Sequence, residues 1–174
     1  MTRILAFDPG STRSGWCLVV SNDARPVVVD FVAAGEVDST SPEVCALLGE
    51  LQPGVVAVEV LRGIAYPAKG AGIVGNLASA SFAAGLIAGL ATPVCDEAVV
   101  EMTAREWRGS VLGKPNASDQ AIAVVVPRLV RGWPKRSNVH ERDAGGLALA
   151  VAWRRASMSR AALRLVGTDD GAPF

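Results

Sequence analysis

The sequence predicts an α/β fold built on a five-stranded mixed sheet, in which three antiparallel strands are followed by parallel ones and helices flank the sheet. Two observations predict it. Three short apolar runs separated by turn residues open the chain, and helical and extended segments alternate after them. With 174 residues, of which 50% are hydrophobic and 20% charged, the chain suits one compact domain and not a disordered one.

Five segments are predicted as strands, at residues 4–7, 15–20, 26–37, 55–60 and 92–100. The first three are joined by short turns, which Gly15 and the polar stretch 21–23 mark, so they are expected to pair as an antiparallel meander. A helix separates the third strand from the fourth. This crossover allows the fourth strand to lie parallel beside the first.

Five helices are predicted, at about residues 42–52, 74–90, 103–113, 116–130 and 139–156. Pro42 suits the first position of a helix, and Thr103 with Glu106 forms a capping box. Pro127 is expected to bend or interrupt the fourth helix. We expect residues 1–156 to form the folded domain and residues 157–174 to form a C-terminal tail that frays.

Two carboxylates are expected at one edge of the sheet. In the stretch ILAFDPGSTRSGW, Asp8 follows a buried strand directly and precedes a Pro-Gly turn. Glu59 stands at the end of the fourth strand. Corresponding ends of adjacent parallel strands lie together, and sites of open α/β sheets form there. Asp8 and Glu59 would repel each other unless a positive group lay between them, because buried carboxylates need a partner or a metal ion.

The last helix adds two candidate site residues. His140 and Asp143 are three positions apart, so they share one helix face, which Leu147 and Ala150 continue toward the core. If this apolar face packs on the sheet, His140 and Asp143 lie over the strand ends, near Asp8.

Three carboxylates and one imidazole make an oxygen-rich site, which suits Mg²⁺ or Mn²⁺ better than zinc. Two such ions about 3.5–4 Å apart can hydrolyse a phosphodiester. Each residue also has a plainer interpretation: Asp8 as a turn residue, Glu59 as a solvated charge at the sheet rim, and His140 as a surface residue of its helix. Their joint placement, and not any one of them, favours the site.

Basic residues are concentrated in one part of the chain. Residues 103–164 contain 12 Lys or Arg against 4 Asp or Glu, whereas the rest contains 5 against 13. This asymmetry favours a basic face for a polyanion, although the net charge of the chain is zero. A solvated helical surface explains the same pattern, and charge alone does not separate the two.

No segment predicts secretion or membrane insertion. The apolar run before Asp8 is shorter than a signal peptide requires. The longest apolar stretch, residues 82–91, is too short to cross a bilayer. The three cysteines, Cys17, Cys45 and Cys95, form no C-x-x-C pair and are expected to be core thiols. We therefore expect a cytoplasmic protein with no membrane partner.

Four segments carry a resemblance to a known family, and together they span about residues 3–156: ILAFDPGSTRSGW, VVAVEV, MTAREWRGSVLGKPNASDQAI and HERDAGGLALAVAW. In this order they resemble the RuvC family of Holliday junction resolvases, within the RNase H-like nuclease superfamily. The resemblance implies an RNase H-like fold. It also implies a homodimeric endodeoxyribonuclease that nicks two opposed strands of a four-way DNA junction and leaves 5′-phosphate and 3′-hydroxyl ends, a reaction of DNA recombination and repair.

The resemblance also implies roles for single residues. Asp8, Glu59 and Asp143 become the acidic ligands of two Mg²⁺ ions, with Mn²⁺ as a substitute, and His140 becomes a fourth catalytic or ligating group. The candidate DNA-binding residues are Arg13, Arg62, Tyr66, Lys69 and Lys114. The loop after Glu59 departs from the family pattern in the spacing of its aromatic and basic residues. Tyr66 is either a base-stacking residue or a loop anchor, and Lys114 is either a phosphate contact or a surface lysine.

Three other functions are compatible with parts of this pattern. An RNase H-like nuclease acting on flaps, forks or structured RNA would use the same acidic residues. An ATP-binding protein of the actin or sugar-kinase type also begins with D-x-G, but it needs a longer chain and a second phosphate loop. A non-catalytic DNA-binding module would not need the complete acidic set. Junction resolution is therefore the preferred hypothesis.

Overall fold

The computed structural model describes residues 1–22, 27–39, 42–62, 71–97 and 99–166. The strands are β1 (Thr2–Asp8), β2 (Arg13–Ser21), β3 (Val29–Asp38), β4 (Val55–Glu59) and β5 (Val100–Met102). The helices are α1 (Pro42–Leu51), α2 (Ala71–Ala91), α3 (Ala104–Leu112), α4 (Asp119–Leu129) and α5 (Val139–Val166). The strands form one sheet in the order β3-β2-β1-β4-β5, which confirms the predicted five-stranded sheet.

The strand directions match the expected mixed sheet. The pairs β1–β2 and β2–β3 are antiparallel, and the pairs β1–β4 and β4–β5 are parallel. Because Phe7 pairs with Val58 in the parallel register, Asp8 and Glu59 occupy the next positions on neighbouring strands. The register therefore brings both carboxylates to the same edge of the sheet.

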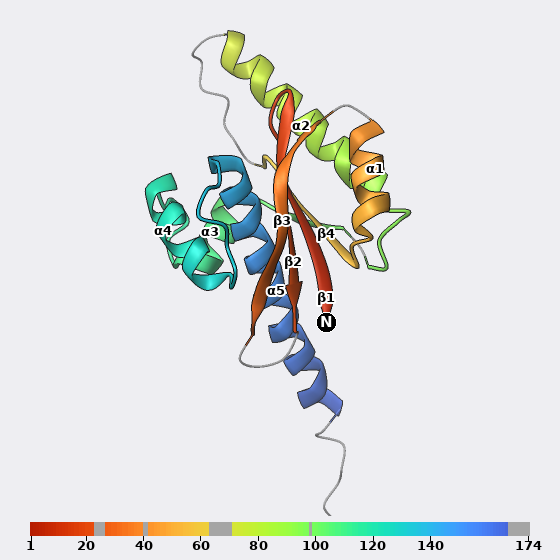
Figure 1. The fold of residues 1–174 in the computed structure, drawn as a ribbon, viewed down its shortest axis with the longest axis vertical. Coiled ribbons are helices and arrows are strands. Elements are labelled where there is room, and N and C mark those ends of the chain that lie inside the picture. The colour runs from red at the N-terminus through yellow and green to blue at the C-terminus, as the bar shows by residue number, and fades with distance from the viewer. Residues whose placement is uncertain (23–26, 40–41, 63–70, 98, 167–174) are drawn as a thin grey trace, which may run out of the picture.

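Helices cover both faces of the sheet. Figure 1 shows α1 and α2 on one side and α3, α4 and α5 on the other. The alternation of side chains along β1 supplies both cores: Ile4 and Ala6 pack toward α5, while Leu5 and Phe7 pack toward α1 and α2. All four are fully buried. This double cover explains why residues 4–7 of β1 and 55–58 of β4 are continuous apolar runs.

Three glycines allow α5 to lie close to its neighbours. A Cβ atom at Gly15 would lie 2.5 Å from the Cβ of His140. At Gly145 and Gly146, a Cβ would meet the rings of Trp133 at 2.3 Å and Trp107 at 2.5 Å, respectively. These contacts explain the two glycines inside a helix, where glycine is otherwise unfavourable by about 1 kcal/mol relative to alanine.

The helix signals in the sequence are confirmed in part. α1 begins at Pro42 as predicted, and Thr103 and Glu106 form both hydrogen bonds of the capping box. Gly113 ends α3 with φ 67°. Pro127 lies inside α4, which continues for two residues beyond it, so the proline does not interrupt the helix.

Two element boundaries differ from the prediction by more than three residues. The fifth strand is only Val100–Met102, because residues 92–95 form turns that end α2, with Cys95 donating its backbone N–H to the carbonyl of Ala91. α5 continues to Val166, beyond residue 156. The division into a domain and a tail at that residue stays a prediction.

The expectation that all three cysteines are core thiols is wrong for Cys45. Cys17 is buried in β2, whereas Cys45 is exposed on α1. Val44 and Leu48 form the buried side of that helix, and Cys45 points away from that side. No described helix has the length and apolar character that a membrane span requires.

Candidate active site

The structure brings Asp8, Glu59, His140 and Asp143 together, and we call these four residues the acidic centre. Asp8 and Glu59 lie at the ends of neighbouring strands, and His140 and Asp143 lie in the first turns of α5. The Nδ1 atom of His140 lies 2.7 Å from Oδ2 of Asp8. Gly15, opposite the backbone of His140, allows this close approach of α5 to the sheet.

Each carboxylate of the acidic centre has a protein partner. Asp8 pairs with His140, Glu59 Oε2 accepts a hydrogen bond of 2.7 Å from the indole Nε1 of Trp107, and Asp143 Oδ2 accepts one of 3.0 Å from Arg108. The other oxygen of Asp143, Oδ1, is buried without a hydrogen-bond partner. An orphaned buried carboxylate oxygen is unfavourable and is available to a cation.

Burial and mutual repulsion shift the pKa values of this cluster. Burial raises the pKa of Glu59 to about 7, and the charges of Asp8 and Asp143 add to the effect. Burial raises the pKa of Asp143 to about 6, and the charge of Asp8 contributes again. The hydrogen bond to Asp8 raises the pKa of His140. Strongly shifted carboxylates at a strand edge are typical of functional sites.

These shifts predict how stability depends on pH in the metal-free protein. The folded chain binds protons more tightly than the unfolded chain between pH 4 and 7, because the ordinary pKa values of 3.8 and 4.5 rise to about 6 and about 7. The free energy of unfolding should therefore fall as pH rises through this window, by on the order of 3 kcal/mol. Urea unfolding in EDTA at pH 4.5 and 7.5 measures the change.

The control for this pH effect is Glu59→Gln, which keeps an acceptor for Trp107 and removes the charge. This variant should be more stable than the wild type at pH 7.5 and should depend less on pH. Identical pH dependence in the two proteins would contradict the raised pKa of Glu59.

The donor set fits a hard divalent cation. Three carboxylates and one imidazole are oxygen-rich, and the orphaned Oδ1 of Asp143 offers a free ligand atom. Among the described residues, no three acidic, histidine or cysteine side chains already enclose a metal site. His140, Trp107 and Arg108 hold the carboxylates instead. The chemistry of the residues fits Mg²⁺ or Mn²⁺. That two such metal ions bind here stays a proposal.

The predicted DNA-binding residues are distributed differently. Arg13 is exposed and pairs with Glu36 at 3.5 Å, Arg62 is exposed and pairs with Glu101, and Lys114 is exposed just after α3. Tyr66 and Lys69 lie outside the described residues. Arg13 and Arg62 thus have carboxylate partners that a phosphate would need to displace.

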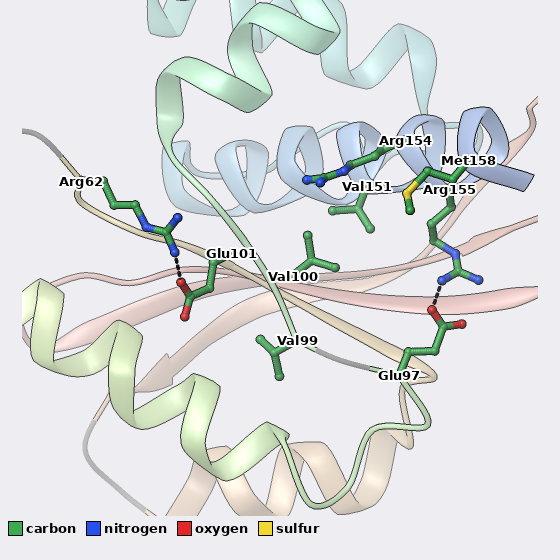
Figure 2. A pocket seen from close by; sticks show the side chains of 9 residues that line it. All are labelled: Arg62, Glu97, Val99, Val100, Glu101, Val151, Arg154, Arg155 and Met158. Carbon is green, nitrogen blue, oxygen red and sulfur yellow. Dashed lines mark hydrogen bonds and ion pairs between the residues drawn. The ribbon is translucent and has the colours of Figure 1, made fainter. Parts of the chain in front are cut away.

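A groove of about 670 Å³ lies away from the acidic centre, between the edge strand β5 and the later turns of α5. Figure 2 shows Arg62 and Glu101 at one end of it and Arg155 and Glu97 at the other. None of the four residues of the acidic centre lines this groove. The candidate site is therefore a set of converging side chains at the sheet edge and not this groove.

Sequence reasoning missed Trp107 and Arg108. Both lie on α3 and contact two different carboxylates of the acidic centre, and Arg108 also pairs with Asp119 at 3.3 Å. The capping box at residues 103–106 fixes where α3 begins, but it does not show which side chains of the helix point inward. Their partners come from β4 and α5, 48 and 35 residues away, so no local pattern could name them.

Comparison with solved structures identifies the fold. The structure of Thermus thermophilus RuvC matches 89% of this chain and 96% of its own, with 22% identity and a TM-score of 0.59. The T. thermophilus RuvC complex with a Holliday junction substrate matches 90% and 97%, with 19% identity and a TM-score of 0.65. The chain has the RuvC fold. A third structure with this fold, the yeast mitochondrial Holliday junction resolvase Ydc2, matches 90% of this chain and 79% of its own, with 13% identity and a TM-score of 0.53.

The RuvC fold is an RNase H-like fold, which confirms the predicted fold class. No protein-family model matches the chain, and no curated protein matches its sequence. At these identities the likeness establishes the architecture, while the activity depends on the residues described above.

Proposed function

We propose that this chain is a metal-dependent endonuclease that resolves four-way (Holliday) DNA junctions. The convergence of Asp8, Glu59 and Asp143 from β1, β4 and α5, with His140 bonded to Asp8, carries the proposal. These three carboxylates are at least 51 positions apart in sequence, yet they gather at one edge of the sheet although their like charges repel one another. The RuvC fold supports the choice of a junction as substrate.

Asp8, Glu59 and Asp143 would hold the cations, with His140 as a fourth candidate ligand. Two Mg²⁺ ions, or Mn²⁺ in their place, would activate water and stabilise the leaving oxygen of a phosphodiester. Arg108 neutralises Asp143 in the metal-free protein, so it would release that carboxylate when a cation binds. In the proposed reaction the bond between phosphorus and the 3′ oxygen breaks, which leaves a 5′-phosphate and a 3′-hydroxyl.

His140 is suited to handle a proton at this site. Its side chain is 49% exposed, and Nδ1 is engaged by Asp8, so Nε2 is the nitrogen left for the substrate or a cation. The carboxylate also raises the pKa of the imidazole, which extends the protonated form to higher pH. A protonated His140 would act as a general acid and donate its proton to the leaving 3′ oxygen.

Two substitutions separate these roles of His140. His140→Asp should keep clear Mg²⁺-dependent cleavage, because a carboxylate can replace a ligand. His140→Ala should lose about 100-fold or more in kcat, the scale of a positioned acid–base group. Single-turnover cleavage between pH 6 and 9 measures both. Wild-type rates for His140→Ala across this range would show that the residue only belongs to the helix surface.

The basic residues of α3, α4 and the connections around them are suited to the DNA backbone. Within the described residues, Arg105, Lys114, Arg128, Lys135 and Arg136 are exposed and have no carboxylate partner. Two other basic residues of the segment 103–164 already form ion pairs within the chain: Arg131 pairs with Asp30, and Arg155 pairs with Glu97. The excess positive charge of residues 103–164 is thus only partly available to DNA.

The proposed enzyme is a homodimer, because two opposed strands require two acidic centres. α2 offers a surface for such a contact. Phe82 is 66% exposed on α2, and Ala78, Gly85 and Gly89 are exposed on the same side of the helix. The small residues beside the exposed ring of Phe82 would let a second copy of α2 approach closely, so we propose this face of α2 as the dimer contact.

Phe82→Glu should convert the dimer into a monomer, because a charge would be buried at the contact. Analytical ultracentrifugation measures the change, and the monomer should lose paired nicking. Val124→Glu is the matched control, since Val124 is 49% exposed on α4, on the other side of the sheet. A wild-type protein that is monomeric at the concentration of the cleavage assay would contradict the dimer.

A comparison of substrates tests the proposed specificity. A mobile four-way junction, a flap, a replication fork and an RNA duplex are incubated side by side with the protein and Mg²⁺. The proposal predicts preferred cleavage of the four-way junction. Preferred cleavage of any of the other three would retain the nuclease and reject junction resolution.

A further inference from the structure

Trp107 links the acidic centre to the hydrophobic core. Its ring is fully buried, and its Nε1–H donates a 2.7 Å hydrogen bond to Oε2 of Glu59. Glu59 is at the last position of β4. The indole therefore bridges α3 and the end of β4.

Three features of the structure fix the position of this ring. The capping box of Thr103 and Glu106 fixes the first turn of α3, which carries Trp107. On the side of α5, Gly146 gives the ring space, since a Cβ there would lie 2.5 Å from it. The guanidinium of Arg108 lies 5.3 Å from the ring centroid. With the ring fixed on these sides, its N–H points at Glu59 without rearrangement.

The two donors on α3 treat their carboxylates differently. Arg108 brings a positive charge to Asp143 and so competes with a cation. Trp107 is neutral and only donates a hydrogen bond, so it orients Glu59 and leaves the negative charge of the carboxylate available. It occupies one oxygen, Oε2, and leaves the other, Oε1, to a ligand.

We propose that Trp107 is a positioning residue that orients Glu59 for binding a divalent cation. This inference rests on the proposed function, because Glu59 is one of the carboxylates that would hold the cation there. Outer partners of this kind change metal affinity or activity by about 10- to 100-fold when they are removed.

Trp107→Phe tests the role, with Trp133→Phe as a matched control. Trp133 also packs against a glycine of α5, Gly145, but its indole donates to the hydroxyl of Ser137 at 3.1 Å and not to a carboxylate. Both variants lose an indole hydrogen bond beside α5, so urea unfolding should show losses of stability in both. Only Trp107→Phe should weaken Mn²⁺ binding in calorimetry, by about 10- to 100-fold.

Cleavage kinetics of Trp107→Phe provide a second test of this role. Trp107→Phe should lower kcat at fixed metal, while the KM for a four-way junction stays near the wild-type value. Mn²⁺ affinity and kcat within twofold of the wild type would overturn the role of Trp107. If both variants shifted metal affinity equally, the effect would be one of core packing, and the proposal would also fail.

Two further results keep the outcomes distinct. If Trp107→Phe does not fold, incorporation of 3-benzothienylalanine at position 107 keeps the ring shape and removes only the N–H donor, with the same expected loss of Mn²⁺ affinity. A wild-type protein that neither binds Mn²⁺ nor cleaves a junction would reject the proposed function, and the role of Trp107 with it. A wild type that does both, with unchanged variants, would reject the role of Trp107 alone.

Discussion

Asp8→Asn should abolish cleavage of a four-way junction and leave junction binding near the wild-type level. Asp8 is the central charge of the acidic centre, since it bonds His140 and raises the pKa values of both Glu59 and Asp143. Removing a ligand of a catalytic cation forfeits several kcal/mol of transition-state stabilisation, so the cleavage rate should fall by more than about 1,000-fold. Binding could tighten, because a negative charge near phosphate is lost.

Asp96→Asn is the control for this result. Asp96 is exposed and lies 3.8 Å from where a Cβ of Gly54 would stand, just before β4, so it is at the other end of the strand from Glu59. Cleavage by this variant should match the wild type. Gel-shift titrations without Mg²⁺ and single-turnover cleavage with Mg²⁺ separate binding from chemistry. Rapid cleavage by Asp8→Asn would reject the metal assignment.

Gly15→Ala should damage both stability and activity. The added Cβ would lie 2.5 Å from the Cβ of His140 and 2.7 Å from its carbonyl carbon, so the start of α5 must move away from β2. Overpacking of this kind destabilises by about 1–3 kcal/mol. A displacement of about 1 Å in a catalytic group lowers the rate by about 100-fold, and His140 and Asp143 both lie on the displaced turns.

Gly49→Ala is the matched control for the alanine substitution. Gly49 is exposed on α1, and no atom lies within 4 Å of a Cβ placed there. This variant should be more stable than the wild type by about 0.5–1 kcal/mol, because glycine is unfavourable inside a helix. Urea unfolding and junction cleavage measure both variants. Wild-type stability and activity of Gly15→Ala would show that Gly15 is not needed for the packing of α5 against β2.

The sheet could be predicted because its signals are local. Residues 4–7 of β1 and 55–58 of β4 are apolar at every position, since helices cover both faces of the sheet. Pro42, Thr103 and Gly113 mark helix ends through their own backbone chemistry. The fifth strand was misplaced because residues 92–95, although apolar in part, complete the hydrogen bonds of the last turn of α2.

Only those residues of the candidate site that lie at strand ends or share one helix face could be predicted from the sequence. Topology alone places Asp8 beside Glu59, and a spacing of three places His140 and Asp143 on one face. The roles of Trp107 and Arg108 depend on where α3 packs between β4 and α5, which is a matter of tertiary contact. The same holds for Gly15, Gly145 and Gly146, whose need for space comes from side chains elsewhere in the chain.

Mapping the nicks that the wild-type protein makes in a synthetic four-way junction tests whether it is a metal-dependent junction resolvase. Each of the four strands is end-labelled in turn, and the reactions contain either Mg²⁺ or EDTA. A metal-dependent resolvase should make paired nicks at matching positions on two opposed strands, with 5′-phosphate and 3′-hydroxyl ends that DNA ligase can seal, and no nicks in EDTA. An intact junction in Mg²⁺, or nicks that persist in EDTA, would contradict it.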